Sequence, residues 1–130
     1  MSDVQPVLYI DDIEGAIAFY RDGLGMEVNE FGTDPESGRP NIFLASIEGA
    51  KFLVSRDRAF TKTGDSGSGG VTLYFHLDSP VDGYVERFRS ADGVEIVEDL
   101  TDQWWGDRTF TIRDPWGYVL IFSSVPGGFI

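Results

Sequence analysis

The chain repeats itself at a nearly constant interval, and this duplication limits its fold more than any other feature. Residues 49–55 (GAKFLVS) match residues 117–123 (GYVLIFS) 68 positions later. Residues 10–12 (IDD) match residues 77–79 (LDS) 67 positions later, so one residue has been inserted between the two matches. A period of this length predicts two similar structural modules in tandem.

Each half carries one amphipathic helical stripe. Apolar residues recur at i, i+3, i+4 and i+7: Ile13, Ala16, Ile17 and Tyr20 in the first half, and Val81, Tyr84, Val85 and Phe88 in the second. This spacing places the four side chains on one buried helical face. Asp11 or Asp12 is a candidate cap for the first helix, and Ser79 followed by Pro80 suits the start of the second.

The rest of each half has the alternation and β-branched content of strands. The first half predicts strands at 4–10, 26–31, 41–47 and 51–55, and the second at 71–77, 94–97, 108–113 and 118–123. We therefore predict an α+β fold with two tandem βαβββ modules forming curved mixed sheets. A single domain, 1–130, would comprise module one at about 1–56, a glycine-rich linker at about 57–70, and module two at about 71–125.

The composition excludes several classes of protein. With 10 Lys and Arg against 22 Asp and Glu, the net charge is −12, so nucleic acid is an unsuitable partner. The same field favours a cationic ligand, although it also serves simply to keep the surface soluble. The chain has no cysteine, and it shows neither a membrane-spanning apolar run nor a signal peptide. We expect a cytoplasmic protein without membrane partners.

Five motifs resemble those of a known superfamily: Asp-Ile-Glu at 12–14, Ala-Phe-Tyr-Arg at 18–21, Leu-Gly-Met at 24–26, Trp-Gly-Asp-Arg at 105–108, and Asp-Pro-Trp-Gly-Tyr at 114–118. The chain is similar over nearly its whole length to the glyoxalase, bleomycin-resistance protein and extradiol dioxygenase (vicinal oxygen chelate) superfamily. The resemblance implies two strongly bent sheets. It predicts the fold rather than the function, because such folds host binding proteins, lyases, isomerases and oxygenases.

In metal-dependent members of that superfamily, the resemblance implies His, Gln or Glu ligands on the first and last strands of each half. The matching positions here are Gln5, Leu53, Thr72 and Ile121. A divalent ion needs several N, O or S ligands, and Leu53 and Ile121 supply none. We therefore expect no metal and no other cofactor at these positions.

Four further residues are candidates for ligand contact. His76 and Tyr74 alternate on one strand; His76 is either a polar anchor or acid/base group for a bound molecule, or a histidine satisfied by local hydrogen bonds. Trp104 and Trp105 precede the seventh strand. They would form a flat aromatic wall for a ligand, or pack into a core or a dimer interface.

These observations leave three classes of function. The favoured one is a metal-independent protein that binds a small molecule, such as a cationic aromatic antibiotic, at Gln5, Leu53, Thr72, Tyr74, His76, Trp104, Trp105 and Ile121, with no catalytic residue. The second is a lyase, isomerase or dioxygenase with an atypical site. The third is a subunit or regulatory module with an emptied cup, the cup being the concave sheet surface. Asp107 and Arg108 are interpreted as a polar pair beside a turn, and open sheet edges favour a homodimer.

Overall fold

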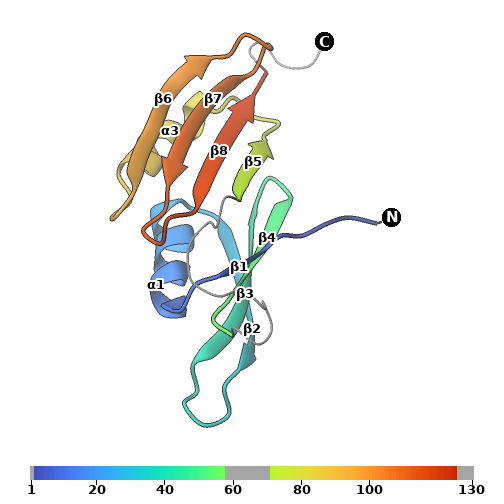
Figure 1. Ribbon diagram of the computed structural model, residues 1–130, viewed down its shortest axis with the longest axis vertical. Coiled ribbons are helices and arrows are strands. Elements are labelled where there is room, and N and C mark those ends of the chain that lie inside the picture. The colour runs from blue at the N-terminus through green and yellow to red at the C-terminus, as the bar shows by residue number, and fades with distance from the viewer. Residues whose placement is uncertain (1, 58–70, 126–130) are drawn as a thin grey trace. The chain divides into compact units, whose positions relative to one another are not determined.

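The structure is a computed structural model that describes residues 2–57 and 71–125. The chain divides into two compact units, unit 1 within Met1–Gly67 and unit 2 within Ser68–Ile130 (Figure 1). We describe each unit by itself. The linker predicted at about 57–70 lies, from residue 58 on, outside the described residues. In the described part of the chain, no helix combines the length and the apolar character needed to cross a bilayer.

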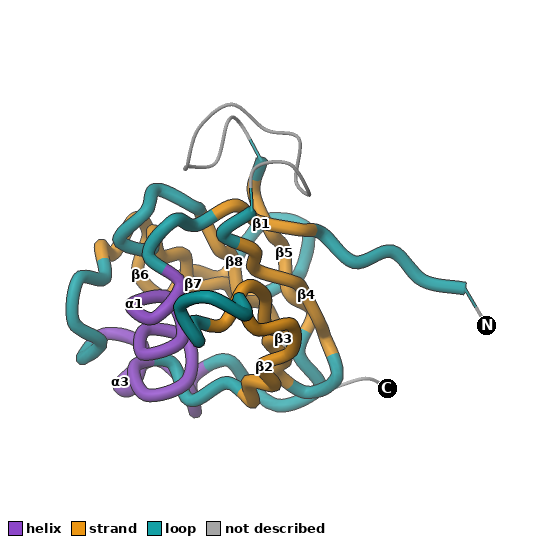
Figure 2. Tube along the Cα trace, turned by 90° about the horizontal axis from the view of Figure 1, so that it is seen from below, coloured by secondary structure: helices purple, strands orange, loops and turns teal. Residues whose placement is uncertain are grey.

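Unit 1 is a four-stranded mixed sheet with one helical segment. Its elements are, in chain order, β1 (Val7–Tyr9), α1 (Ile13–Ile17), η1 (Ala18–Gly23), β2 (Glu27–Thr33), β3 (Pro40–Ile47) and β4 (Ala50–Ser55). The strand order is β1-β4-β3-β2. β1 and β4 run parallel, while the other neighbours are antiparallel. Figure 2 shows the four strands in orange and α1 in purple.

Unit 2 repeats this plan. Its elements are β5 (Thr72–His76), α3 (Asp82–Arg89), β6 (Glu95–Asp102), β7 (Arg108–Arg113) and β8 (Val119–Ser124). The strand order is β5-β8-β7-β6, again with a parallel outer pair, β5 and β8. Both units are therefore βαβββ modules, and the α+β fold with mixed sheets that the sequence predicts is confirmed.

Strand registers confirm the equivalence of the two halves. Leu53 on β4 pairs with Val7 on β1 and with Leu44 on β3. Ile121 on β8 pairs in the same way with β5 and β7. Because Leu53 and Ile121 occupy the same place in the same strand of their units, the repeat in the sequence reflects a repeat in the backbone.

The core of each unit lies between its sheet and its helical segment. In unit 1, Tyr20 meets Phe52 edge to face, with ring centroids 5.3 Å apart. In unit 2, Phe88 lies 4.5 Å from Phe122 between ring centroids. All four rings are fully buried. Burying side chains of this size contributes about 1.5–3 kcal/mol each, so these faces supply much of the stability of each unit.

The two helices begin differently from one another. Asp12 caps α1 as predicted, because its carboxylate accepts a hydrogen bond of 3.0 Å from the backbone N–H of Gly15. The prediction of a Ser79 cap for α3 is wrong: the N-cap is Val81, without a side-chain cap. The N–H of Val81 instead donates to the hydroxyl of Ser124 on β8 at 2.8 Å, so a neighbouring strand satisfies this helix end.

The first helical segment also changes type along its length. From Ala18 to Gly23 it is a π-helix, in which the N–H of Leu24 donates to the carbonyl of Phe19 at 2.9 Å. A π turn inserts an extra residue into each hydrogen-bonded ring. The apolar stripe nevertheless stays buried through Tyr20, so the predicted buried face is correct although the helix does not remain α-helical.

The last hairpins of the two units use different turns. In unit 1, Glu48 and Gly49 have positive φ angles of 51° and 85°, which is the two-residue turn that matches the twist of a hairpin. In unit 2 the turn is one residue longer. There the buried Asp114 carboxylate accepts hydrogen bonds from the N–H groups of Trp116 at 3.0 Å and Tyr118 at 2.8 Å.

The turn of unit 2 also packs against Gly93, which lies in the segment after α3. Gly93 has a φ of 82°, and a Cβ at that position would lie 2.9 Å from Cγ of Pro115. Such a separation is shorter than side chains tolerate. Gly93 is therefore required both by its left-handed backbone and by the proline packed against it.

β1 and β6 differ most from their predicted ranges, while the other strands agree to within two residues at each end. β1 is Val7–Tyr9 rather than 4–10, so Gln5 lies before the strand; its neighbour Pro6 has no N–H to donate to a ladder. β6 is Glu95–Asp102 rather than 94–97, and its pairing with β7 shifts register twice. Each register shift leaves extra residues of β6 unpaired with β7, so the strand continues beyond the part of the sequence that alternates between apolar and polar residues.

Candidate functional site

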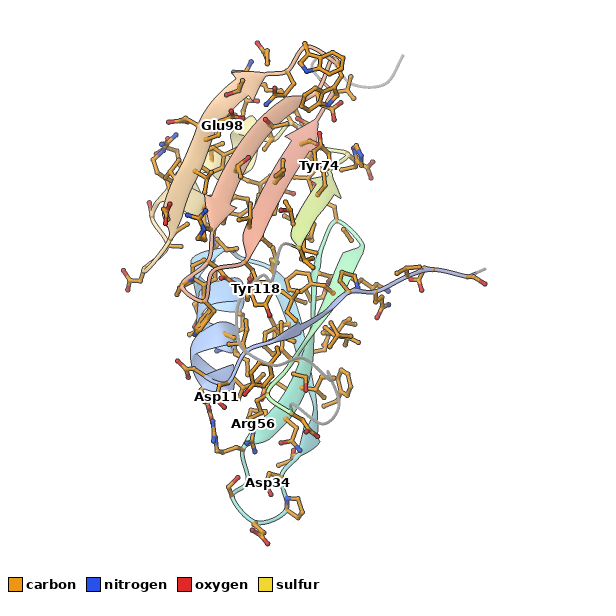
Figure 3. All side chains as sticks on the ribbon, in the orientation of Figure 1. Asp11, Asp34, Arg56, Tyr74, Glu98 and Tyr118 are labelled. Atoms are coloured by element: carbon orange, nitrogen blue, oxygen red, sulfur yellow. The ribbon has the colours of Figure 1, made fainter. Side chains whose placement is uncertain are left out.

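Three predicted site residues share one face of β5. Thr72, Tyr74 and His76 are exposed, while the intervening Leu73 and Phe75 are buried against the helix side of the sheet. Alternate residues of a strand point to opposite faces. The face opposite α3, here called the Tyr74 face, therefore carries all three side chains. Tyr74 is labelled in Figure 3.

Two rows of residues cross the Tyr74 face from β5 through β8 to β7. The first row is Tyr74, Ile121 and Thr111, and the second is His76, Ser123 and Thr109. Ile121 is half-buried, whereas Thr109, Thr111 and Ser123 are buried. The structure thus brings together three residues that the sequence singled out, Tyr74, His76 and Ile121, and adds hydroxyl groups beside them.

The Tyr74 hydroxyl is held by a carboxylate. It donates to Oδ2 of Asp107 at 2.7 Å. Burial raises the pKa of Tyr74 above its ordinary value of 10.0, and the bond to Asp107 raises it further, while hydrogen bonds with Ser123 and Trp105 act in the opposite direction. Tyr74 is therefore a neutral phenol at ordinary pH, and its hydroxyl proton lies toward Asp107.

His76 lies beside Tyr74, with ring centroids 4.9 Å apart. The hydroxyl of Ser123 donates to the carbonyl of Phe75 at 3.1 Å and lies 3.4 Å from Nδ1 of His76. A serine hydroxyl has one proton, and with that proton assigned to the carbonyl of Phe75 the contact with His76 suits an Nδ1 that carries a proton. In this assigned neutral tautomer of His76, Nε2 is the hydrogen-bond acceptor.

Trp104 and Trp105 occupy the turn between β6 and β7, which closes with a hydrogen bond of 3.1 Å from the N–H of Gly106 to the carbonyl of Gln103. Their rings are nearly perpendicular, at 84°, with centroids 5.3 Å apart. Trp105 is 48% exposed and Trp104 is 91% exposed. Trp105 neighbours the Tyr74 hydroxyl, whereas Trp104 stands out from the surface against the Trp105 ring.

The remaining predicted positions, Gln5 and Leu53, belong to unit 1. Gln5 is half-buried ahead of β1, and Leu53 lies between Val7 and Leu44 in a row of hydrocarbon side chains. This row supplies no ligand atom. The donor set of the four positions implied by the resemblance therefore does not fit a divalent ion. Across residues 2–57 and 71–125, no three His, Asp or Glu side chains are grouped so that they could hold a metal.

The sequence interpretation missed Asp107 and misassigned its partner. Asp107 was paired with Arg108, but the guanidinium of Arg108 contacts Asp82 at 3.3 Å and Asp102 at 3.2 Å. The two neighbours leave the turn on opposite faces of β7, so Asp107 meets Tyr74 instead. Ser123 was also missed, although it follows Ile121 by two residues and so shares its face.

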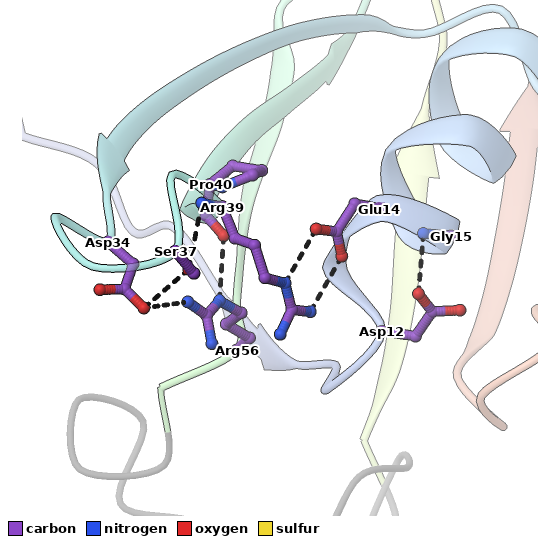
Figure 4. Close-up of polar contacts among 8 residues, drawn as sticks. All are labelled: Asp12, Glu14, Gly15, Asp34, Ser37, Arg39, Pro40 and Arg56. Carbon is purple, nitrogen blue, oxygen red and sulfur yellow. Dashed lines mark hydrogen bonds and ion pairs between the residues drawn. The ribbon is translucent and has the colours of Figure 1, made fainter.

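A second polar network in unit 1 secures the loop between β2 and β3 (Figure 4). Arg56 contacts Asp34 at 3.2 Å and donates to the carbonyl of Pro40 at 3.1 Å. Arg39 donates two hydrogen bonds of 2.9 Å to the carboxylate of Glu14 on α1, and these bonds lower the pKa of Glu14 to about 2. Each cation is matched by a carboxylate, so this network ties the loop down rather than offering a site.

The profile of the glyoxalase, bleomycin resistance protein and dioxygenase superfamily matches residues 4–122. The chain belongs to this superfamily. An uncharacterised protein of Mycobacterium bovis is 31% identical over 121 residues, which are 88% of this chain and 78% of that protein. An uncharacterised protein of Mycobacterium tuberculosis has the same identity and covers 88% of this chain and 69% of its own length.

Several solved structures share the fold of this chain. TioX from Micromonospora sp. ML1 superposes with a TM-score of 0.67 at 24% identity, covering 99% of this chain and 98% of TioX. A glyoxalase-related enzyme from Fulvimarina pelagi gives a TM-score of 0.71 at 18% identity, covering 97% of this chain and 90% of that enzyme. At these identities the likeness establishes the fold of this chain alone. Its ligand has to be inferred from the residues of the site.

Proposed function

We propose that this superfamily member is a metal-independent binding protein for a small organic molecule, and that the ligand is aromatic and positively charged, as some antibiotics are. One observation carries the proposal: on the Tyr74 face, the exposed rings of Tyr74 and Trp105 are neighbours, and the Tyr74 hydroxyl is bonded to a carboxylate, Asp107. Small-molecule sites combine apolar and aromatic surface with a few polar groups that set orientation.

The replaced metal positions support a binding role without a metal. Leu53 and Ile121 present carbon where a chelating member would present N or O ligands, and an apolar surface favours ligand carbon. Gln5 alone, with the weaker Thr72, does not make up a stable coordination set. The proposal therefore assigns recognition to side-chain contacts and not to a chelated pair of ligand oxygens.

The charge of the chain supports a cationic ligand. A net charge of −12 raises the local concentration of cations around the protein. Salt of physiological strength screens this field beyond about 8 Å, so the net charge mainly affects the association rate. Affinity has to come from close contacts, and Asp107, which accepts the Tyr74 hydroxyl, provides a negative charge on that face.

One observation favours an enzyme as the second candidate. Tyr74 offers a neutral hydroxyl and His76 an acceptor nitrogen on adjacent side chains. A donor and an acceptor this close are the elements of general acid–base catalysis, as in a metal-free isomerase. Turnover of a carbonyl substrate that is lost in His76→Asn would favour this candidate over binding alone.

Calorimetric titration of the full chain with planar aromatic cations and matched anions, at two salt concentrations, tests the proposal. We expect the cations to bind more tightly than the anions. Trp105→Ala should lower the affinity for the best ligand about tenfold, because stacking and burial are lost. Phe31→Ala is a suitable control, because Phe31 is 49% exposed but lies on β2 of unit 1. Tighter binding of anions, or equal effects of the two variants, would contradict the proposed site.

Elemental analysis of the purified chain tests metal independence separately. We expect no stoichiometric divalent ion, and unchanged ligand affinity after treatment with a chelator. One tightly bound metal per chain, removed together with ligand binding, would refute this part of the proposal. The homodimer remains a companion proposal based on the open edges of both sheets, and a monomer in light scattering at micromolar concentration would contradict it.

A further inference from the structure

Among the described residues, Asp107 is a carboxylate that has an aromatic neighbour but no ion-pair partner. Its Oδ2 accepts the Tyr74 hydroxyl at 2.7 Å. Within residues 2–57 and 71–125 it forms no ion pair, since Arg108, the adjacent cation, is shared between Asp82 and Asp102. The site therefore holds a fixed negative charge beside an exposed ring, without a partner of opposite charge from the described chain.

The hydrogen bond to Asp107 also changes what the Tyr74 ring offers. A phenol that donates to a carboxylate is polarised, and its oxygen and ring face become more negative. Tyr74 is 38% exposed, so part of that ring is open to a ligand. An aromatic face within about 6 Å of a cation attracts it through the ring quadrupole, and the polarised phenol strengthens this attraction.

His76 adds a directional requirement. With the Ser123 proton assigned to the carbonyl of Phe75, the neutral tautomer of His76 that suits this contact carries its proton on Nδ1 and leaves Nε2 as an acceptor. No described residue donates to Nε2. A ligand group that satisfies this nitrogen must carry a hydrogen-bond donor.

We propose that the Tyr74 face contains a subsite for an organic ammonium group with at least one N–H. In this subsite Asp107 supplies charge, Tyr74 an aromatic face, and Nε2 of His76 an acceptor. The inference rests on the proposed function and specifies the positive group of its ligand: a protonated primary or secondary amine attached to an aromatic body. A quaternary ammonium satisfies the charge but leaves the acceptors without a hydrogen.

Three compounds with one aromatic body test the subsite: 1-naphthylmethylammonium, its N-trimethyl derivative, and 1-naphthalenemethanol. The primary ammonium and the alcohol are similar in size and differ in charge, whereas the trimethyl derivative keeps the charge, lacks an N–H and is larger by three methyl groups. With the full chain in calorimetry, we expect the primary ammonium to bind about tenfold more tightly than the alcohol, with the trimethylammonium between them. A tenfold ratio is what one additional charged hydrogen bond contributes.

Asp107→Asn isolates the charge, because the amide oxygen still accepts the Tyr74 hydroxyl. We expect this variant to lose about tenfold in affinity for the ammonium and to keep its affinity for the alcohol. Asp92→Asn is the matched control: it removes one negative charge from an exposed position after α3. Its effect on the ammonium should be small and should vanish at the higher salt concentration.

The outcomes separate the subsite from the proposed function. If the alcohol binds as tightly as the ammonium, and Trp105→Ala weakens both, the ammonium subsite is refuted while aromatic binding stands. If Asp92→Asn matches Asp107→Asn, only the general field acts, and the subsite is likewise refuted. If none of the three compounds binds, the subsite is refuted, and the wider panel of cations and anions decides the proposed function.

Discussion

Units 1 and 2 have the same backbone plan but different side chains on the sheet face that points away from the helix. In unit 1 the first row across that face is Val7, Leu53 and Leu44; in unit 2 it is Tyr74, Ile121 and Thr111. The second row changes from Tyr9, Ser55 and Ile42 to His76, Ser123 and Thr109. The first row is wholly aliphatic in unit 1 but has hydroxyl groups at two of its three places in unit 2, whereas the second row keeps a serine at its centre in both units.

The opposite faces show no such divergence. Phe43 and Phe110 are equivalent, and both are fully buried against their helical segments. Packing tolerates little change in volume or polarity, because each core must fill its own space. The comparison indicates that each unit kept its core, while the face opposite the helix was free to specialise in unit 2 alone.

The largest expected effect tests whether the two cores are equivalent. Phe43→Ala and Phe110→Ala should each lower the free energy of unfolding by about 3–5 kcal/mol, because both leave a cavity in a fully buried position. Urea unfolding measures the loss, with the exposed Phe31→Ala as a control that should change it by less than about 0.5 kcal/mol. A small effect at one position only would break the equivalence.

The next effect tests the difference between the two hairpin turns. Asp114→Ala should cost about 1–3 kcal/mol, because it leaves the N–H groups of Trp116 and Tyr118 without their acceptor. Gly49→Ala should cost about 1–2 kcal/mol, since alanine is strained at a φ of 85°. Both are measured by urea unfolding. A neutral Asp114→Ala would mean that solvent replaces the carboxylate.

Exchanging one pair of equivalent residues tests the divergence directly. Tyr74→Val gives unit 2 the residue that unit 1 has at the equivalent place. We expect this variant to bind an aromatic ammonium about tenfold more weakly, because it removes both the ring and the hydroxyl that is bonded to Asp107. The reciprocal Val7→Tyr should create no affinity when placed in the Tyr74→Val background. Calorimetry measures both, and restored binding in the double variant would contradict a site confined to unit 2.

The smallest expected effect is the contribution of one surface ion pair in each unit to the free energy of unfolding. Arg39 lowers the pKa of Glu14 from 4.5 to about 2, and Arg89 lowers the pKa of Asp99 from 3.8 to about 2. A carboxylate with a lowered folded-state pKa stabilises the fold above its ordinary pKa and loses that contribution as the pH falls to the lowered value. These exposed pairs are screened, so the contribution is small.

Urea unfolding of Glu14→Gln and of Asp99→Asn across pH checks this expectation. Each variant should be slightly less stable than the parent chain above about pH 4.5, and the difference should disappear as the pH approaches about 2. High salt should reduce the difference at every pH. A difference that grows on acidification would show that the pairs do not stabilise the folded state.

The sequence predicts the scaffold well because its signals are local or repeated. The stripe at Ile13 to Tyr20 and the Asp12 cap depend on neighbours within one turn, and both are found in the structure. The equivalence of Leu53 and Ile121 follows from the repeat itself. Ser79 fails as a cap because the competing hydroxyl, Ser124, comes from a strand that is distant in the sequence.

The candidate site was predictable only in part for the same reason. Alternation places Tyr74 and His76 on one face from the sequence alone. The bond between Tyr74 and Asp107 joins residues 33 positions apart, and it depends on how the turn after Trp105 directs its side chains. Periodicity carries no information on that direction, so Asp107 was assigned to its neighbour Arg108.

The contact between Gly93 and Pro115 has a consequence for how this protein can vary over evolutionary time. A side chain at position 93 meets both an unfavourable backbone angle and the proline ring 2.9 Å from its Cβ. Replacing Pro115 with a smaller residue removes one obstacle but not the other. Among descendants of this chain, position 115 can therefore drift while Gly93 persists, whereas a new side chain at position 93 requires that position 115 has changed first.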